Sequence, residues 1–161
     1  RTASKAYALA GLRVGFALAR REVLAEVEPY RPPGSVAIPS VAVVTAALRD
    51  PGILAANLAR VERERARLAA AFAAAGLPVG PSVTNFLLVD VGGPEAARAL
   101  ASGLLARGLV PRTFGSDHPL AGHLRFTVRD EAEDDRLIEA IGDLAPAVRT
   151  LRTPAAQESQ R

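Results

Sequence analysis

The sequence has 161 residues, 49% of them hydrophobic, which is enough to bury a core in one domain or in parts of two. Its 20 basic and 17 acidic residues leave a formal charge of only +3, the two signs are interleaved, and 4% of the residues are aromatic, so a nucleic-acid partner is not expected. The lack of cysteine excludes disulfides and thiolate metal sites and fits a reducing cytoplasm, and no apolar run reaches the ~18 residues that a membrane span needs.

The first segment of the chain contains its single lysine, Lys5, whereas the other 19 basic residues are arginine. A lysine amine can lose its proton when desolvated and condense with an aldehyde, whereas a guanidinium stays protonated and is a poor nucleophile. Lys5 follows a hydroxyl, Ser4, and Arg13 comes eight residues later. The segment is therefore a candidate for covalent attachment of an aldehyde; the alternative is that an arginine-rich composition has left one lysine by chance.

The same segment resembles the motif of a known enzyme family. Arg-Thr-Ala-Ser-Lys at residues 1–5, followed by Leu-Ala-Gly-Leu-Arg-Val-Gly-Phe at residues 9–16, is similar to the cofactor-lysine segment of fold-type I pyridoxal-phosphate aminotransferases, and most similar to their histidinol-phosphate branch. The resemblance implies that Lys5 binds pyridoxal 5'-phosphate covalently and is the catalytic residue. It also implies that Ser4 and Arg13 hold the cofactor's phosphate.

The resemblance further implies an α/β fold, with this chain as the C-terminal part of a longer enzyme, because the family's lysine lies past the middle of the polypeptide and this sequence begins with arginine rather than methionine. The expected organisation comprises the end of the cofactor-binding large domain, connecting helices, a small α/β domain and a disordered tail. These parts are assigned to residues 1–40, 41–76, 77–148 and 149–161.

Taken in chain order, residues 12–19 form a nearly all-apolar run, which predicts a strand buried on both faces of a parallel sheet. A charge in such a strand, here Arg13, needs an anionic partner or a route to solvent; an arginine paired with a carboxylate at the sheet edge is the alternative. Residues 21–28 suit one or two helical turns, and the prolines within residues 30–35 predict a loop.

Two helices are expected next. Ser40 is predicted to cap a helix that runs to Leu48, and Asp50-Pro51 to begin a longer one that ends at Gly76. The apolar stripe of the longer helix comprises Ile53, Leu54, Leu58, Val61, Leu68, Phe72 and Leu77.

The remaining sequence alternates between strand and helix patterns, which predicts a compact α/β unit. The expected strands are residues 84–91, 109–112 and 124–128, and the expected helices run from Gly92-Gly93-Pro94-Glu95 to about residue 107 and onward from residues 129–131, with Leu137, Ile138 and Ile141 inward. The glycine pair is expected to be a plain turn rather than an anion-binding nest. His118 and His123 are too few for a metal cluster, and we expect them to face solvent or lie in loops.

The resemblance also implies substrate-binding residues. Arg125 resembles the family's carboxylate-binding arginine, and Arg112 resembles a second anion binder that meets a substrate phosphate or a side-chain carboxylate. Asn85 belongs to an Asn-Phe pair common in the family. Surface ion pairs are the alternative for both arginines, and the chain has Arg129 where the motif usually continues with glycine.

These observations predict transamination between a small-molecule amino donor and a keto acid, with histidinol phosphate and glutamate or 2-oxoglutarate as the expected pair. The resemblance implies a homodimer in the full-length protein, and neither nucleic acid nor membrane is expected as a partner. An aromatic or other amino-acid aminotransferase and a threonine-phosphate decarboxylase remain alternatives with similar chemistry. A noncatalytic module for anion binding or oligomerisation is the alternative of a different class.

Overall fold

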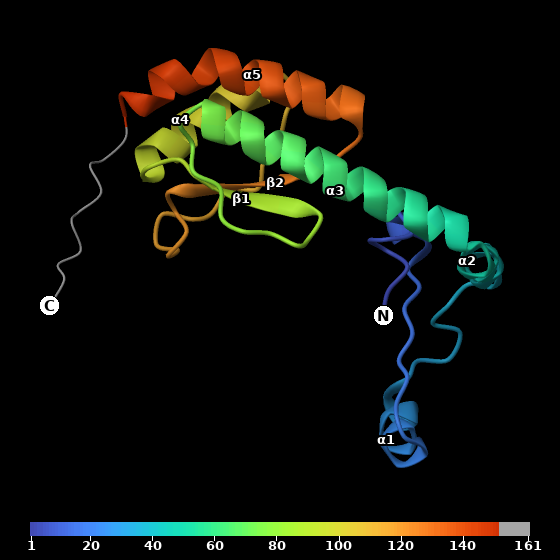
Figure 1. The fold of residues 1–161 in the computed structure, drawn as a ribbon. Coiled ribbons are helices and arrows are strands. Elements are labelled where there is room, and N and C mark those ends of the chain that lie inside the picture. Colours follow the sequence, from blue (N-terminus) through green and yellow to red (C-terminus); the bar gives the residue numbers. More distant parts are fainter. Residues whose placement is uncertain (152–161) are drawn as a thin grey trace, which may run out of the picture. The chain divides into compact units, whose positions relative to one another are not determined.

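The computed structural model describes residues 1–151, which fall into two compact units, residues 1–59 and a second unit that begins at Arg60. In the first unit lie η1 (Ala10–Leu12), α1 (Arg21–Val27), η2 (Glu28–Tyr30), α2 (Ile38–Arg49) and the start of α3 (Pro51–Ala74). In the second lie the rest of α3, β1 (Phe86–Asp90), α4 (Pro94–Leu105), β2 (His123–Thr127) and α5 (Glu131–Arg149) (Figure 1).

The second unit is built on an antiparallel pair of strands, β1 and β2, in which Phe86 lies opposite Thr127 and Leu88 lies opposite Arg125. Single-residue bridges extend the pair on both sides, from Val79 to Val89 and from Arg112 to Arg125. Because successive side chains of a strand point to opposite faces, the strands have an inner face that is buried and an outer face that is partly exposed.

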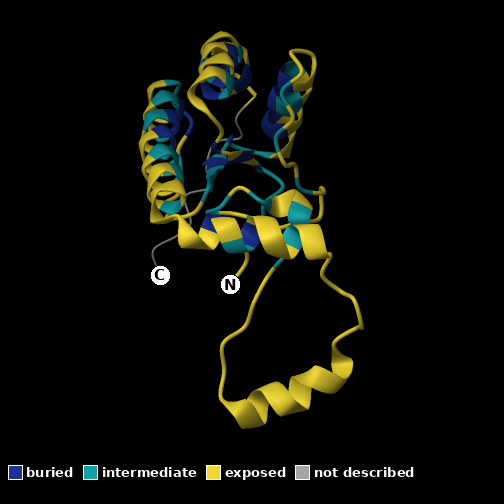
Figure 2. Cartoon of the chain, turned by 90° about the vertical axis from the view of Figure 1, so that its right-hand side faces the viewer, coloured by how far each residue is buried: buried dark blue, intermediate teal, exposed yellow. Residues whose placement is uncertain are grey.

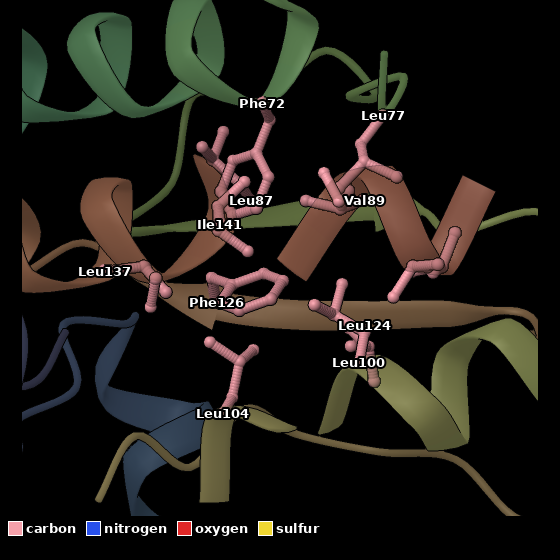
Figure 3. Close-up of a cluster of buried hydrophobic side chains, with 14 of the residues drawn as sticks. Phe72, Leu77, Leu87, Val89, Leu100, Leu104, Leu124, Phe126, Leu137 and Ile141 are labelled. Atoms are coloured by element: carbon pink, nitrogen blue, oxygen red, sulfur yellow. The ribbon is translucent and has the colours of Figure 1, made fainter. Parts of the chain in front are cut away.

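The inner face of this sheet carries Leu87, Val89, Leu124 and Phe126, all at most 4% exposed. Helices α3, α4 and α5 cover it and complete a continuous core, in which the rings of Phe72 and Phe126 lie 4.7 Å apart (Figures 1 and 3). The labelled helix residues of Figure 3 are Phe72 from α3, Leu100 and Leu104 from α4, and Leu137 and Ile141 from α5. The predicted α/β unit is confirmed in this form.

Local signals in the sequence place most helix ends correctly. Asp50 accepts a hydrogen bond from the Gly52 N–H (2.8 Å) at the start of α3, and Gly76 follows the end of that helix with a positive φ of 73°. Asp130 accepts a hydrogen bond from the Glu133 N–H and caps α5. Ser40 is not a cap, because α2 begins two residues earlier at Ile38 and places Pro39 in its first turn, where a missing N–H costs nothing.

The strand predicted for residues 12–19 is wrong. Residues 10–12 form a 3-10 turn, and only Thr2 and Gly15 form a bridge, supported by a hydrogen bond from the Phe16 N–H to the Arg1 carbonyl (2.9 Å). Leu18 is 90% exposed, so this apolar run is not buried on either face. A strand needs a continuous partner, and within the described residues this segment pairs only with the first few residues of the chain.

The strand predicted for residues 109–112 reduces to the single bridge of Arg112 with Arg125. Pro111 lacks an N–H and has a fixed φ, so it fits poorly into a longer ladder. The Gly92-Gly93 pair is a tight turn with positive φ angles at both residues, in which Gly92 N–H donates to Asp90 Oδ1 (2.8 Å).

The end of α5 lies beyond the boundary predicted for the small domain, because this helix runs to Arg149 and buries Val148. Residues 152–161 of the predicted disordered tail lie outside the described residues. Within the described part of the chain no single helix is long and apolar enough to cross a membrane; α2 and α3 reach the threshold only as a pair, with an 80° bend between them.

Candidate active site

Residues 1–16, called the Lys5 loop below, contain the three predicted cofactor ligands. The Ala3 N–H donates to the Val14 carbonyl (3.1 Å) and Thr2 forms a bridge with Gly15, so the two ends of the loop lie antiparallel to each other. Ser4 and Lys5 follow directly after this pairing on one side of the loop. Arg13 lies just before it on the other side.

The three side chains differ in whether they already form hydrogen bonds within the loop. Ser4 Oγ accepts a hydrogen bond from Thr2 Oγ1 (2.8 Å), and Arg13 Nη1 donates to the Ala10 carbonyl (2.9 Å). Lys5 is exposed, and its amine has no hydrogen bond or ion pair within the part of the chain that the structure describes. The Lys5 amine is therefore not occupied by another group of the described residues.

Arg13 is not the buried strand charge that the sequence suggested. It is exposed, has a positive φ of 54°, and ends the 3-10 turn formed by residues 10–12. Its guanidinium contacts a main-chain carbonyl and no carboxylate among the described residues, so its remaining N–H donors are available for an anion.

These residues fit a phosphorylated aldehyde. Lys5 supplies an amine for the aldehyde, and Ser4 and Arg13 supply a hydroxyl and a guanidinium, which are suitable donors to phosphate. All three come from one short loop, residues 1–16.

Arg112 and Arg125, which were predicted to bind substrate anions, are opposed in one antiparallel bridge. Arg112 N–H donates to the Arg125 carbonyl (2.9 Å) and Arg125 N–H donates to the Arg112 carbonyl (3.0 Å). Residues directly opposite in such a pair have their Cβ atoms about 4.5–5.5 Å apart on the same face of the sheet. The fold of the second unit thus places the Cβ atoms of the two arginines side by side on one face.

Both arginines line a groove of about 680 Å³ together with residues 108–111 and the start of α5. Like charges in proximity repel unless an anion lies between them, and neither arginine forms an ion pair with a carboxylate of residues 1–151. Two further cations line the groove: Arg129 is bound by both oxygens of Glu133 (2.8 and 3.0 Å), and Arg136 donates to a main-chain carbonyl (3.4 Å). Arg112 and Arg125 are thus available for an anionic ligand.

Asp134 also lines this groove and is 1% exposed. Both of its carboxylate oxygens accept the Arg129 N–H at 3.2 Å. Burial raises its pKa from 3.8 to about 6, and the Glu64 carboxylate adds to the rise, while the Arg129 N–H and the Arg67 guanidinium oppose it.

Asn85 precedes β1 by one residue, and its carbonyl accepts the Val128 N–H (2.9 Å); its side chain makes no hydrogen bond within the described residues, and its role stays a prediction. His118 is exposed, as expected, and its ring stacks on Phe114 at 5.0 Å. His123 differs from the expectation, because it begins β2, is half-buried, and has its Nδ1 shut off from solvent without a partner among residues 1–151.

The sequence reasoning missed Phe86. Its ring lies under the Arg125 guanidinium, with 5.0 Å from Cζ to the ring centroid. The Asn-Phe pair was noted in the sequence, but the contact depends on the register of β1 and β2, which the sequence does not specify. Alternation along β1 shows only that Phe86 and Leu88 share a face.

Known proteins similar to this chain belong to one family. The family described as "Aminotransferase class I and II" matches residues 1–141. A histidinol-phosphate aminotransferase of Shouchella clausii is 38% identical over 150 residues, covering 92% of this chain and 40% of that protein, and one of Symbiobacterium thermophilum is 40% identical over 141 residues, covering 88% and 38%.

Among solved structures, histidinol-phosphate aminotransferase from Sinorhizobium meliloti in complex with pyridoxal-5'-phosphate is similar, with a TM-score of 0.83 and 33% identity over 94% of this chain and 41% of that one. The chain spans about 40% of the length of the curated relatives it matches. Its mixed α/β fold thus corresponds to part of a pyridoxal-phosphate aminotransferase, and the chain belongs to the class I and II aminotransferase family.

Proposed function

We propose that the protein containing this chain is a pyridoxal-phosphate-dependent aminotransferase that exchanges an amino group between histidinol phosphate and 2-oxoglutarate, a reaction of histidine biosynthesis. The observation that carries the proposal is the opposed pair Arg112 and Arg125, which has no carboxylate partner among the described residues. Glutamate carries two carboxylates and histidinol phosphate carries a phosphate, so both substrates suit a pair of guanidinium groups. The names of the relatives support the same substrate.

Lys5, Ser4 and Arg13 would hold the cofactor. When bound, pyridoxal phosphate supplies an aldehyde that takes up the amino group and a ring that withdraws electrons from the substrate Cα. Ser4 Oγ and the free N–H groups of Arg13 would bind the phosphate. Lys5 Nζ would take the proton from the Cα of the amino donor as a general base. In the opposite half-reaction the protonated Lys5 Nζ would deliver a proton to the Cα of the product as a general acid.

The two arginines would divide the substrate between them. Arg125 would bind the α-carboxylate of glutamate through two parallel hydrogen bonds and so fix the direction of the Cα–H bond. Arg112 would bind the remote anion, which is the phosphate of histidinol phosphate or the side-chain carboxylate of glutamate. Asn85 is proposed as a further substrate-binding residue near the end of β2.

We also propose the domain assignment made from the sequence: residues 1–40 in the cofactor-binding domain, 41–76 as connecting helices and 77–148 as the small domain. A homodimer is proposed for the whole protein. Several large apolar side chains of residues 1–59 are exposed, among them Leu18 at 90% and Ile38 at 85%, as expected of a surface that packs against further polypeptide, either the rest of the protein or a second copy of it. Light scattering coupled to size-exclusion chromatography tests the dimer.

The test of the function starts with the protein that contains this chain, saturated with pyridoxal phosphate. Addition of histidinol phosphate and 2-oxoglutarate is expected to produce glutamate at a rate proportional to enzyme, and the Lys5→Arg variant serves as the matched control. Reaction with other amino donors but none with histidinol phosphate would assign the protein to a sibling specificity. Failure to take up the cofactor, judged by the absorption band of the lysine-bound form, would favour the noncatalytic anion-binding module.

A further inference from the structure

Arg125 has an unusual environment for a charged side chain. It lies on the partly exposed outer face of β2, and within the described residues it forms no ion pair, yet its guanidinium lies over the ring of Phe86. Phe86 is diagonal to Arg125 across the strands, because Leu88 is directly opposite Arg125 and Phe86 is two residues away on the same face.

An aromatic neighbour has a property that a carboxylate neighbour lacks. The ring face attracts the cation and restricts a long, flexible side chain, but it does not occupy the two-pronged edge that binds a carboxylate. An aspartate or glutamate at this position would compete with the substrate for the same N–H groups. Phe86 can therefore order Arg125 without blocking it.

The main chain of Phe86 is held by the turn before β1. The Phe86 carbonyl accepts hydrogen bonds from Ser82 Oγ (2.7 Å) and Thr84 Oγ1 (3.2 Å), and the Phe86 N–H donates to Thr84 Oγ1 (3.3 Å). The side chain is half-buried, so its movement is limited. The Arg125 guanidinium thus lies over a residue whose main chain is fixed on both sides.

We propose that Phe86 is a positioning residue that holds the Arg125 guanidinium ready for the α-carboxylate of the substrate. The inference rests on the proposed function, since it assigns Phe86 a part in the same substrate site. It predicts selective effects: a substrate with an α-carboxylate should depend on Phe86, whereas histidinol phosphate, which carries an alcohol there, should not.

The experiment compares Phe86→Leu, which removes the ring but stays apolar, with Phe86→Tyr, which keeps it. Each half-reaction is followed in single turnover in the protein that contains this chain. Phe86→Leu should raise the dissociation constant of glutamate by about two- to thirty-fold, the range of a cation–π contact, with little change in the limiting rate. Phe86→Tyr, which keeps the ring, should bind glutamate with a dissociation constant close to that of wild type. Phe86→Leu should bind histidinol phosphate within about twofold of wild type.

Leu88→Val is the matched control, because Leu88 shares the outer face and is opposite Arg125 but makes no ring contact with it. A second test is the double variant Phe86→Leu with Arg125→Ala. If the ring acts through the guanidinium, Phe86→Leu has no further effect on glutamate binding once Arg125 is absent. Should Phe86→Leu fold poorly by thermal unfolding, Phe86→Met replaces it in both tests.

Equal weakening of glutamate and histidinol phosphate, or the same loss from Phe86→Leu with and without Arg125, overturns the positioning role and leaves the proposed function standing. A wild-type protein that reacts with neither substrate overturns the proposed function, and the positioning role falls with it.

Discussion

The two units of the chain differ in how they hold their functional residues. In residues 1–59 only Ala3, Val44 and Ala47 are buried apolar residues, and α1 is exposed along its whole length (Figure 2). The unit that begins at Arg60 encloses a continuous core under its sheet. The Lys5 loop is thus held mainly by main-chain hydrogen bonds, whereas Arg112 and Arg125 are fixed by a packed scaffold.

This contrast predicts whether a substitution will change activity or stability. A substitution of Ser4, Lys5 or Arg13 is expected to remove the proposed chemistry without removing packing, because these side chains are exposed or half-buried. A substitution under the sheet removes packing first. The predictions below separate these two kinds of effect.

The largest effect is expected for Lys5→Arg. The charge is kept but the nucleophile and proton carrier are lost, so turnover should fall by at least about 10²–10⁴-fold and the absorption band of the lysine-bound cofactor should disappear. Lys5 is exposed, and the melting temperature of the cofactor-free protein should therefore be unchanged. Ordinary turnover by the folded variant would mean that Lys5 is not the catalytic residue.

Next in size is Phe72→Ala in the core of the second unit. Phe72 is 1% exposed and packs on Phe126, and removal of a buried ring typically costs about 3–5 kcal/mol of the free energy of unfolding. Urea unfolding measures the loss, with Leu105→Ala as control, because Leu105 is 62% exposed and should change stability by no more than about 0.5 kcal/mol. Similar losses for the two variants would contradict the core described here.

A smaller effect is expected for Arg13→Ala. A hydrogen bond to a charged group is worth about 1.5–3 kcal/mol, so the dissociation constant of pyridoxal phosphate should rise by about one to two decades. Substrate selectivity should not change, because Arg13 would contact the cofactor alone. Titration of the apoenzyme with cofactor measures the constant, and an unaltered value would remove Arg13 from the phosphate site.

The smallest expected effect is the pH dependence that Asp134 adds to stability. Its pKa is raised to about 6 in the folded protein from 3.8, so between these values the folded state binds more protons than the unfolded state. The free energy of unfolding should therefore fall by on the order of 1 kcal/mol as the pH rises from about 4 to 6, and should level off above pH 6. Urea midpoints for wild type and Asp134→Asn, compared at pH 4.5 and 7, should show this fall in wild type only.

Much of this fold could be predicted from local signals. Asp50-Pro51 and Gly76 bound α3 because proline suits a first turn and glycine adopts a positive φ at a helix end. The strands predicted at residues 84–91 and 124–128 are confirmed as β1 and β2, with slightly different ends. These features depend on a few neighbouring residues, which the sequence displays.

What could not be predicted depends on pairing over long range. An apolar run such as residues 12–19 predicts a strand only if a partner is present, and here its few partners lie at residues 1–3. The resemblance identified Arg112 and Arg125 as separate candidates, but their bridge, and the ring of Phe86 under Arg125, follow from register alone. The half-buried place of His123 depends on the same register.

The division of substrate between the two arginines is the central claim, and single-turnover kinetics of Arg125→Ala and Arg112→Ala test it most directly. Each half-reaction is measured alone, with glutamate and with histidinol phosphate, so that chemistry is separated from product release. Arg125→Ala is expected to weaken the glutamate half-reaction by about 10–100-fold and to affect the histidinol-phosphate half-reaction far less, whereas Arg112→Ala should weaken both. Equal losses in the two half-reactions of Arg125→Ala would contradict the account.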